Sequence, residues 1–193
     1  MTTVTGAETS ERILDVAEEL VQTRGLNAMS YADISDRVGI RKASLHYHFP
    51  AKADLVRALI QRYSTRFFDT LAALESETTD PSRRLRGYAD IYAGVLERGR
   101  MCLCGMLASD FQTLSSEAQH DVERFFERNV DWVERVVTDA VRAGSAPAGT
   151  DPRAAAETVV AGLEGAMLVS RPLRGTERFR TIAHALVAGA TGG

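Results

Sequence analysis

The chain has 193 residues, of which 45% are hydrophobic, and it carries a formal net charge of −3. This length and apolar content suffice for one domain, or two small ones, with a substantial core. Because no apolar run approaches the roughly 18 residues of a membrane helix and no secretory leader is recognisable, we expect a soluble, cytoplasmic protein that does not contact a membrane.

Apolar residues recur at the 3.6-residue spacing of helices along the whole chain, and no sustained period-two alternation occurs. The sequence therefore predicts an all-α protein. The first helix is expected over residues 9–24 and ends at Gly25, with an inward face formed by Ile13, Leu14, Ala17, Leu20 and Val21.

A short second helix is expected to begin after Ser30. The Ser30 hydroxyl can accept a hydrogen bond from the backbone of Asp33, and the Asp33 carboxylate can accept one in return. Met29 and Ile34 occupy the two positions of a hydrophobic staple. Gly39 then supplies the left-handed conformation that ends this helix after about eight residues.

Another short helix follows over residues 42–49. Leu45 and Phe49 lie four residues apart and are expected to point inward. The other positions then face outward with groups that suit phosphates and base edges: Lys42, Ala43, Ser44, His46, Tyr47 and His48. Two short helices joined by a glycine turn are typical of a helix-turn-helix DNA-binding motif, although such pairs also occur in enzymes.

Charge favours the DNA-binding interpretation. Residues 37–67 contain seven basic residues and one acid, which gives a net charge of +6 within a chain whose total is −3. Local basicity on an acidic protein is typical of a surface that binds nucleic acid.

The rest of the chain is expected to form a helical body. A long helix is predicted over residues 52–75, later helices are predicted to begin near Asp80, Asp151 and Thr176, and Ser116 is predicted to cap a further long helix that ends near Arg142. Gly99 and Gly105 are expected to break the chain around the two cysteines. The predicted organisation is a DNA-binding domain over residues 1–50 and a second domain over residues 51–193, with nine helices in all.

The segment up to residue 59 resembles the DNA-binding head of the TetR-type bacterial repressors. The resemblance rests on an ordered set of residues: Gly39, Arg41, Lys42, Ala43, Ser44, Leu45, Tyr47, Phe49, Lys52 and Leu55. It implies a nine-helix TetR-like fold, with a three-helix helix-turn-helix head and a ligand-binding and dimerisation body. It also implies a repressor that binds a palindromic DNA operator as a homodimer and is released by a small, largely apolar effector.

The candidate DNA-binding residues follow from the motif and the resemblance together. Lys52 stands where the family grips the DNA backbone, Arg41 replaces the serine that usually caps the reading helix, and His46 replaces a tyrosine. Without that serine, about 1 kcal/mol of capping is expected to be missing. The full set is Ser30, Tyr31, Arg41, Lys42, Ala43, Ser44, His46, Tyr47, His48 and Lys52.

The last two long helices are the expected dimer interface. Small residues in the penultimate helix permit close helix packing, and the resemblance implies a four-helix bundle across a two-fold axis. The candidates are Ala161, Gly162, Gly165, Ala166, Leu168, Phe179, Ile182 and Leu186. The alternative is that the penultimate helix is central to the core of the monomer itself.

Aromatic and sulfur-containing residues of the body are candidates for lining an effector pocket with a few polar groups. They are Phe67, Tyr88, Tyr92, Met101, Cys102, Met106, Phe125, Trp132 and Met167. Each of them also fits an ordinary core position, and none identifies the effector.

The Cys102 and Cys104 pair suggests a second kind of regulator. Arg98 and Arg100 are close in sequence and could lower a thiol pKa, so that the cysteines would sense oxidants or electrophiles. The alternative is that both are buried core residues. An α-helical metal- or thiol-dependent enzyme is the least supported class, because the four histidines are scattered and no phosphate loop or nucleophile elbow occurs. We therefore expect no catalytic residue, metal or cofactor.

Overall fold

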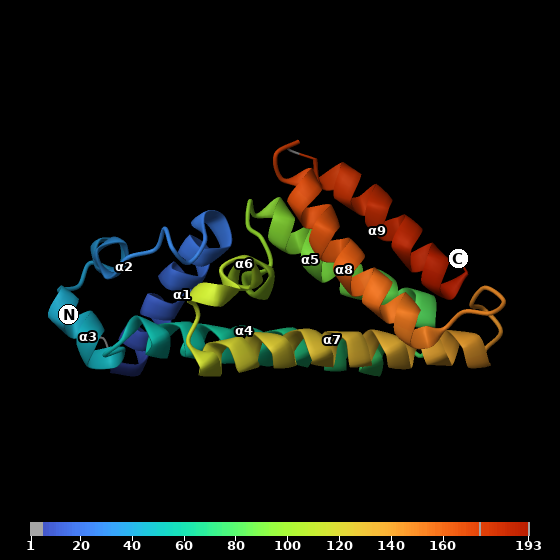
Figure 1. Ribbon diagram of the computed structural model, residues 1–193, viewed down its shortest axis with the longest axis horizontal. Coiled ribbons are helices and arrows are strands. Elements are labelled where there is room, and N and C mark those ends of the chain that lie inside the picture. The colour runs from blue at the N-terminus through green and yellow to red at the C-terminus, as the bar shows by residue number, and fades with distance from the viewer. Residues whose placement is uncertain (1–5, 174, 193) are drawn as a thin grey trace. The chain divides into compact units, whose positions relative to one another are not determined.

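The computed structural model describes residues 6–173 and 175–192. Outside turns and loops these residues are helical, and no strand occurs among them. The elements (Figure 1) are α1 (Gly6–Arg24), α2 (Tyr31–Val38), α3 (Lys42–His48), α4 (Lys52–Glu77), α5 (Pro81–Glu97), α6 (Leu103–Ser109), η1 (Phe111–Thr113), α7 (Ser116–Arg142), α8 (Pro152–Ser170) and α9 (Thr176–Thr191). The predicted all-α class and the predicted count of nine α-helices are confirmed over this part of the chain.

Two predicted helix boundaries were wrong. Gly105 lies inside α6 instead of interrupting a helix. An interior glycine costs a helix only about 1 kcal/mol, and the burial of Leu103 and Leu107 on either side outweighs it. Ser116 is the first residue of α7 and not its cap, because Ser115 Oγ accepts the hydrogen bond from the Ala118 N–H at 3.3 Å.

The chain divides into two compact units. The first, which we call the head unit, contains the described residues up to 65 together with residues 103–123. The second, the body unit, contains residues 66–102 and the described residues from 124 onward. The head unit thus includes α6 and the first turns of α7 in addition to the helices predicted for a domain over residues 1–50. Among the helices described, none combines the length and apolar character needed to cross a bilayer.

The head unit is built around the short helices of the motif. Helix α1 packs against both α2 and α6, and α2 packs against α3. Its core is formed by aliphatic side chains that are at most 1% exposed: Ile13, Leu20, Ile34, Leu45, Leu55 and Leu59. These include the inward positions predicted from the spacing in α1, α2 and α3.

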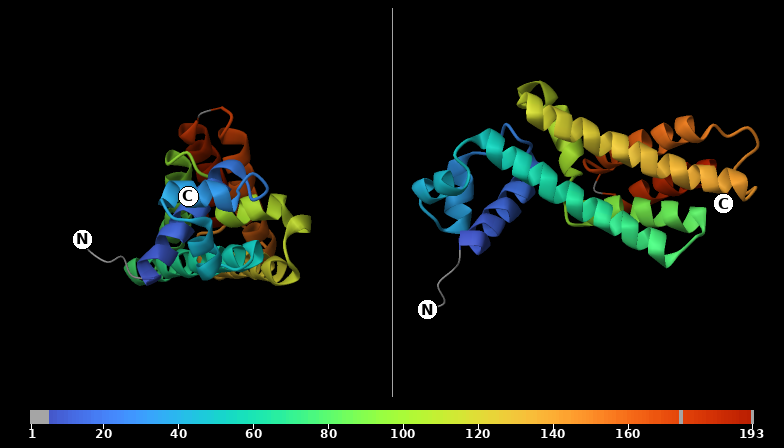
Figure 2. Two further views of the ribbon diagram at one scale, coloured as in Figure 1. Left: turned by 90° about the vertical axis from the view of Figure 1, so that its left-hand side faces the viewer. Right: turned by 90° about the horizontal axis from the view of Figure 1, so that it is seen from below.

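In the body unit, α8 and α9 lie side by side and both contact α5 (Figure 2). The Asp151 carboxylate caps α8 by accepting hydrogen bonds from the N–H groups of Arg153 and Ala154. Large rings fill the interior of this unit, and Tyr88, Tyr92, Phe125 and Phe179 are all at most 2% exposed. The body unit therefore buries more large rings than the head unit does.

Candidate functional site

The start of α2 is fixed by reciprocal hydrogen bonds. Ser30 Oγ accepts from the Asp33 N–H at 3.2 Å, and Asp33 Oδ2 accepts from the Ser30 N–H at 2.9 Å. The hydrogen bond from the Ser30 side chain also lowers the pKa of Asp33. Met29 and Ile34 are buried, so the predicted capping box and staple are confirmed.

Gly39 sets the turn between α2 and α3. Its φ is 76°, in the left-handed region, and its N–H donates to the Ser35 carbonyl at 2.9 Å. A side chain there would meet no other atom of the described residues within 4 Å. The backbone conformation, not lack of space, is therefore what calls for glycine here.

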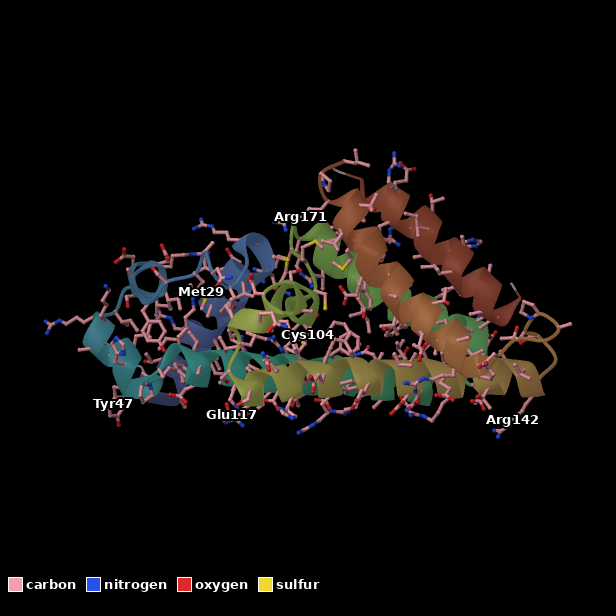
Figure 3. All side chains as sticks on the ribbon, viewed as in Figure 1. Met29, Tyr47, Cys104, Glu117, Arg142 and Arg171 are labelled. Carbon is pink, nitrogen blue, oxygen red and sulfur yellow. The ribbon has the colours of Figure 1, made fainter. Side chains whose placement is uncertain are left out.

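Helix α3 presents one buried and one exposed face. Leu45 is 0% exposed and the adjoining Phe49 is 7% exposed, as predicted for inward anchors. Tyr47 is 83% exposed, and its ring stands away from the ribbon in Figure 3. Arg41, Lys42, Ala43 and His46 are also exposed, whereas Ser44 and His48 are half-buried. As predicted, the Arg41 side chain makes no capping hydrogen bond at the start of α3.

The Tyr31 hydroxyl forms a hydrogen bond within the head unit. The hydroxyl donates to the Phe49 carbonyl at 2.9 Å, just beyond the end of α3. Burial, assisted by Asp54, raises the pKa of Tyr31 to about 12, so the hydroxyl keeps its proton. Its ring centroid is 4.9 Å from that of His46. Tyr31 therefore positions the end of the reading helix through a bond that the sequence did not predict.

Lys52 is also engaged within the protein. Its Nζ donates to the carbonyls of Leu26 and Met29, both at 2.8 Å, in the loop between α1 and α2. Burial lowers the pKa of Lys52, and the nearby Asp110 carboxylate acts in the opposite direction. An ammonium group has three N–H donors, so one remains for a DNA phosphate. The predicted DNA contact thus comes with a structural role that sequence reasoning missed.

Asp110 holds the same loop from the segment after α6. Asp110 Oδ2 accepts from the Leu26 N–H at 3.0 Å, and Oδ1 accepts from Asn27 Nδ2 at 2.8 Å. We call these two bonds, together with the two from Lys52, the loop clasp. No local pattern could have revealed Asp110, because its partners lie 84 and 83 residues away in sequence.

The positive charge of the head is smaller than the sequence count suggested. Arg37 pairs with Glu19 at 2.6 Å, and Arg57 lies 3.6 Å from Asp121. Arg62 contacts three acids of α1: Glu11, Asp15 and Glu18. By contrast, no ion pair formed within the described residues involves Arg41 or Lys42. Two adjacent cations without an ion pair among the described residues thus stand at the start of α3.

In the body unit, five of the predicted pocket residues form one aromatic cluster. The Phe67 ring centroid lies 6.1 Å from Tyr88, 6.1 Å from Tyr92 and 5.2 Å from Phe125. Trp132 stacks on Tyr88 with their ring centroids 5.5 Å apart. We refer to these five residues as the body cluster.

The remaining candidates divide between the two units. Met101, Cys102 and Met167 are buried in the body unit and at most 2% exposed. Met106 belongs to the head unit, where its methyl group lies beside Gly25. Cys104, also in the head unit, is fully buried. Met106 therefore belongs to a different unit from the other pocket candidates.

Two polar residues that sequence reasoning missed belong with the body cluster. Asn129 is 0% exposed and accepts a hydrogen bond from the Tyr88 hydroxyl at 3.1 Å. Glu164 raises the pKa of both Tyr88 and Tyr92 by its charge, in addition to the larger effect of burial. Glu164 had a detectable sequence signature, since it is the only charged residue in the apolar run over 158–170.

The residues predicted for the dimer interface do not share one face. Ala166 and Phe179 are 3% and 0% exposed, so they belong to the core of the protomer. Gly162 packs against Leu186, because a side chain carbon at Gly162 would come within 2.7 Å of Leu186 Cδ1. The close packing of α8 on α9 within one chain accounts for these four positions.

The remaining candidates are more accessible. Ala161 is exposed, Leu168 is 57% exposed and Ile182 is half-buried. A Cβ at Gly165 would meet nothing within 4 Å among the described residues. Ala161, Gly165 and Leu168 follow the i, i+4, i+7 spacing of a single helix face.

This architecture, an exposed short helix after a glycine turn joined to a helical body, defines a DNA-binding transcriptional regulator. The sequence model for bacterial regulatory proteins of the TetR family matches residues 13–59. The model for the tetracycline repressor-like C-terminal domain matches residues 81–186, more than half of the chain. The chain therefore belongs to the TetR family, which is a family of transcriptional regulators and not of enzymes. No group of three or more potential metal ligands occurs among the described residues.

Relatives of known structure or assigned function agree with this placement. A TetR-family transcriptional regulator from Agrobacterium tumefaciens is 33% identical, with a TM-score of 0.92 over 97% of this chain and 100% of that chain. A TetR regulator from Legionella pneumophila is 29% identical, with a TM-score of 0.84 over 96% and 97% of the two chains. The transcriptional repressor DhaR of Mycobacterium sp. strain GP1 is 23% identical over 178 residues, 89% of this chain and 88% of that protein.

Proposed function

We propose that this regulator is a repressor that binds a palindromic operator as a homodimer and leaves it when a small, largely apolar effector binds the body unit. The observation that carries the DNA-binding step is the outward face of α3. Arg41 and Lys42, which form no ion pair with any residue that the structure describes, stand there beside Tyr47, which is 83% exposed. Arginine and lysine donate to guanine edges in the major groove, and such contacts carry sequence specificity.

The accessible face of α8 supports a dimer. Leu168, Val169 and Leu173 are each more than half exposed, which is unusual for large aliphatic side chains gathered at one helix end. A groove of about 460 Å³ between α8 and α9 is lined chiefly by small residues that permit close helix approach, among them Ala155, Ala185 and Gly189. A dimer related by a two-fold axis would carry two DNA-binding heads. A palindromic operator offers two half-sites about 34–36 Å apart for them.

The body cluster supports the effector step. It combines five large rings with buried polar groups, which is the usual composition of a small-molecule site. A ligand that prefers the body conformation of the DNA-free state would shift the equilibrium away from the operator. The name of DhaR as a repressor agrees with this direction of regulation.

The burial of both cysteines weighs against the thiol-sensing alternative. Cys102 is 1% exposed and Cys104 is 0% exposed, so neither presents a sulfur atom to an oxidant in solution. Cys102 also hydrogen-bonds the Glu164 carboxyl group, and a neighbouring carboxylate disfavours formation of a thiolate.

The proposal is tested by fluorescence anisotropy with labelled duplexes from the region upstream of the coding sequence. We expect one duplex to bind with an affinity that falls steeply with salt, and a shuffled duplex of equal length to bind about a thousandfold more weakly. Sedimentation of the complex should give two chains per duplex. Equal affinity for the native and shuffled duplexes would contradict the proposal.

A further inference from the structure

Beside the body cluster lies the Glu164 carboxylate, which has no counter-charge among the described residues. Glu164 Oε1 is buried and accepts no hydrogen bond from any described residue. The thiol of Cys102 forms a hydrogen bond with the Glu164 carboxyl group. Because Oε1 accepts no hydrogen bond, the thiol must donate to Oε2. No cation lies within 4.0 Å of this carboxylate in residues 6–173 or 175–192. A buried carboxylate without a partner is costly, so this oxygen is a strong acceptor for a donor brought from outside.

The hydroxyl groups beside Glu164 also leave an acceptor unused. The Tyr88 hydroxyl donates its one proton to Asn129 Oδ1, so it must accept the 3.0 Å hydrogen bond that it shares with Tyr92. The Tyr92 hydroxyl is therefore the donor in that bond, and its own lone pairs remain available. Asn129 Nδ2 is taken up by the Phe125 carbonyl at 2.7 Å. The chain of hydrogen bonds thus ends in a second acceptor, Tyr92 Oη.

The rings of the body cluster pack against one another. Phe67, Phe125, Tyr88 and Trp132 approach one another with ring centroids 5.2 to 6.1 Å apart. Aromatic faces carry negative potential and attract a desolvated cation. Trp132 Nε1 is also buried and has no hydrogen-bond partner within residues 6–173 and 175–192, so it can donate to an acceptor atom on the same ligand.

From these observations we infer that the body cluster binds an organic cation, with its ammonium group on Glu164 Oε1 and its apolar part among the aromatic rings. The inference rests on the proposed function, because it assigns the chemical class of the effector. A carboxylate ligand would place a second negative charge beside Glu164 and is excluded by repulsion. A neutral alcohol can donate one hydrogen bond but leaves the carboxylate without its counter-charge.

The single tryptophan of the chain, Trp132, allows binding to be followed at the cluster itself. The full-length protein is titrated with three probes of nearly equal size: phenylpropylamine, phenylpropanol and phenylpropionate. Their rings do not absorb at the long-wavelength edge at which tryptophan is excited. We expect the amine to change Trp132 fluorescence at a concentration about tenfold lower than the alcohol, since hydrogen bonds to charged groups are the stronger ones. The acid is expected not to bind.

Glu164→Gln tests the charge directly. Glutamine keeps the shape and one acceptor oxygen, and removal of a buried charge favours folding, so the variant should remain folded. The amine should lose its about tenfold advantage over the alcohol, while binding of the alcohol stays nearly constant. Glu157→Gln, at an exposed glutamate on the same helix that pairs with Arg153, is the matched control and should behave like the parent. Tyr92→Phe should weaken binding of the amine less than Glu164→Gln does.

Operator binding is measured on the same samples, so the two proposals fail separately. A parent protein that binds its operator but shows equal affinity for amine and alcohol would overturn the cation assignment alone. Equal losses of amine affinity in Glu164→Gln and Glu157→Gln would also overturn the cation assignment alone. A parent that binds the amine with the expected Glu164 dependence, yet binds no operator, would leave the cation site standing and overturn the repressor proposal.

Discussion

The α1–α2 loop of the head unit and the surroundings of the body cluster use polar side chains in opposite ways. In the loop clasp, the Asp110 and Lys52 side chains are paired with specific backbone or amide partners at 2.8 to 3.0 Å. In the body cluster, Glu164 Oε1 and Trp132 Nε1 are buried without a partner among the described residues. Paired groups fix a conformation, whereas unpaired groups retain binding energy for a ligand. This difference supports our proposal that the head unit binds DNA as a rigid unit and that the body unit binds an effector.

The largest expected effect comes from separating the two heads. Gly165→Arg places a charged side chain on the accessible face of α8 where the protomer has room for it. We expect a folded monomer by sedimentation, and a loss of operator affinity of about a hundredfold or more because the two heads no longer bind together. Ala72→Arg, at an exposed position of α4, is the control for added charge. A Gly165→Arg variant that stays dimeric would place the interface elsewhere.

The unpaired carboxylate should make stability depend on pH. Burial raises the pKa of Glu164 to about 7. Between the ordinary carboxyl pKa of about 4.3 and pH 7 the native state therefore binds more protons than the unfolded chain, and stability falls as pH rises. The fall amounts to at most about 4 kcal/mol. Urea unfolding at pH values below and above this window should show a smaller loss for Glu164→Gln than for Glu157→Gln. Parallel losses would show that Glu164 titrates normally.

The loop clasp predicts a local loss of stability in the head. Asp110→Ala removes two hydrogen bonds to a charged acceptor, which should cost about 2 kcal/mol, and it leaves the Lys52 ammonium without its nearby carboxylate. Hydrogen exchange of residues 25–30 should accelerate, while exchange in α8 stays unchanged. Asp69→Ala, at an exposed position of α4, serves as the control. Unaltered exchange in the loop would show that the clasp contributes nothing in solution.

The smallest effect on the protein itself, and the most specific effect on DNA, is expected from Arg41→Ala. Arg41 caps nothing and forms no ion pair within the described residues, so folding stability should change by less than about 0.5 kcal/mol. Binding to the correct operator should weaken by about 1–3 kcal/mol, and binding to unrelated DNA much less. Arg124→Ala, at an exposed position of α7, is the matched control. Equal losses on both DNAs would reassign Arg41 to a phosphate contact.

The head could be predicted from sequence because its determinants are local. Ser30 and Asp33 are three residues apart, Leu45 and Phe49 four, and Gly39 acts through its own backbone. Each signal is contained within one or two helical turns, so the pattern in the sequence determines the geometry. The pairing of Arg37, Arg57 and Arg62 with distant acids is what the charge count could not include.

The body could be predicted only as a set of helices. Within the body unit, the Tyr88 hydroxyl donates to Asn129 from 41 residues away in sequence. Hydrophobic spacing shows that a residue is buried but not which helix it faces, so it could not show that Phe179 is fully buried within the protomer or that Met106 belongs to the head unit. Glu164 was overlooked because it stands in an otherwise apolar helix segment, which is the signal that should have singled it out.

The central claim is that the exposed face of α3 reads the operator. Hydrogen exchange of the full-length protein, compared with and without its operator duplex, tests this claim directly. We expect bound DNA to slow amide hydrogen exchange in residues 41–48 and in the backbone near Ser30 and Lys52. Exchange along α8 and α9 should not slow comparably. Protection centred on the body unit, with α3 exchanging at the same rate in both samples, would contradict it.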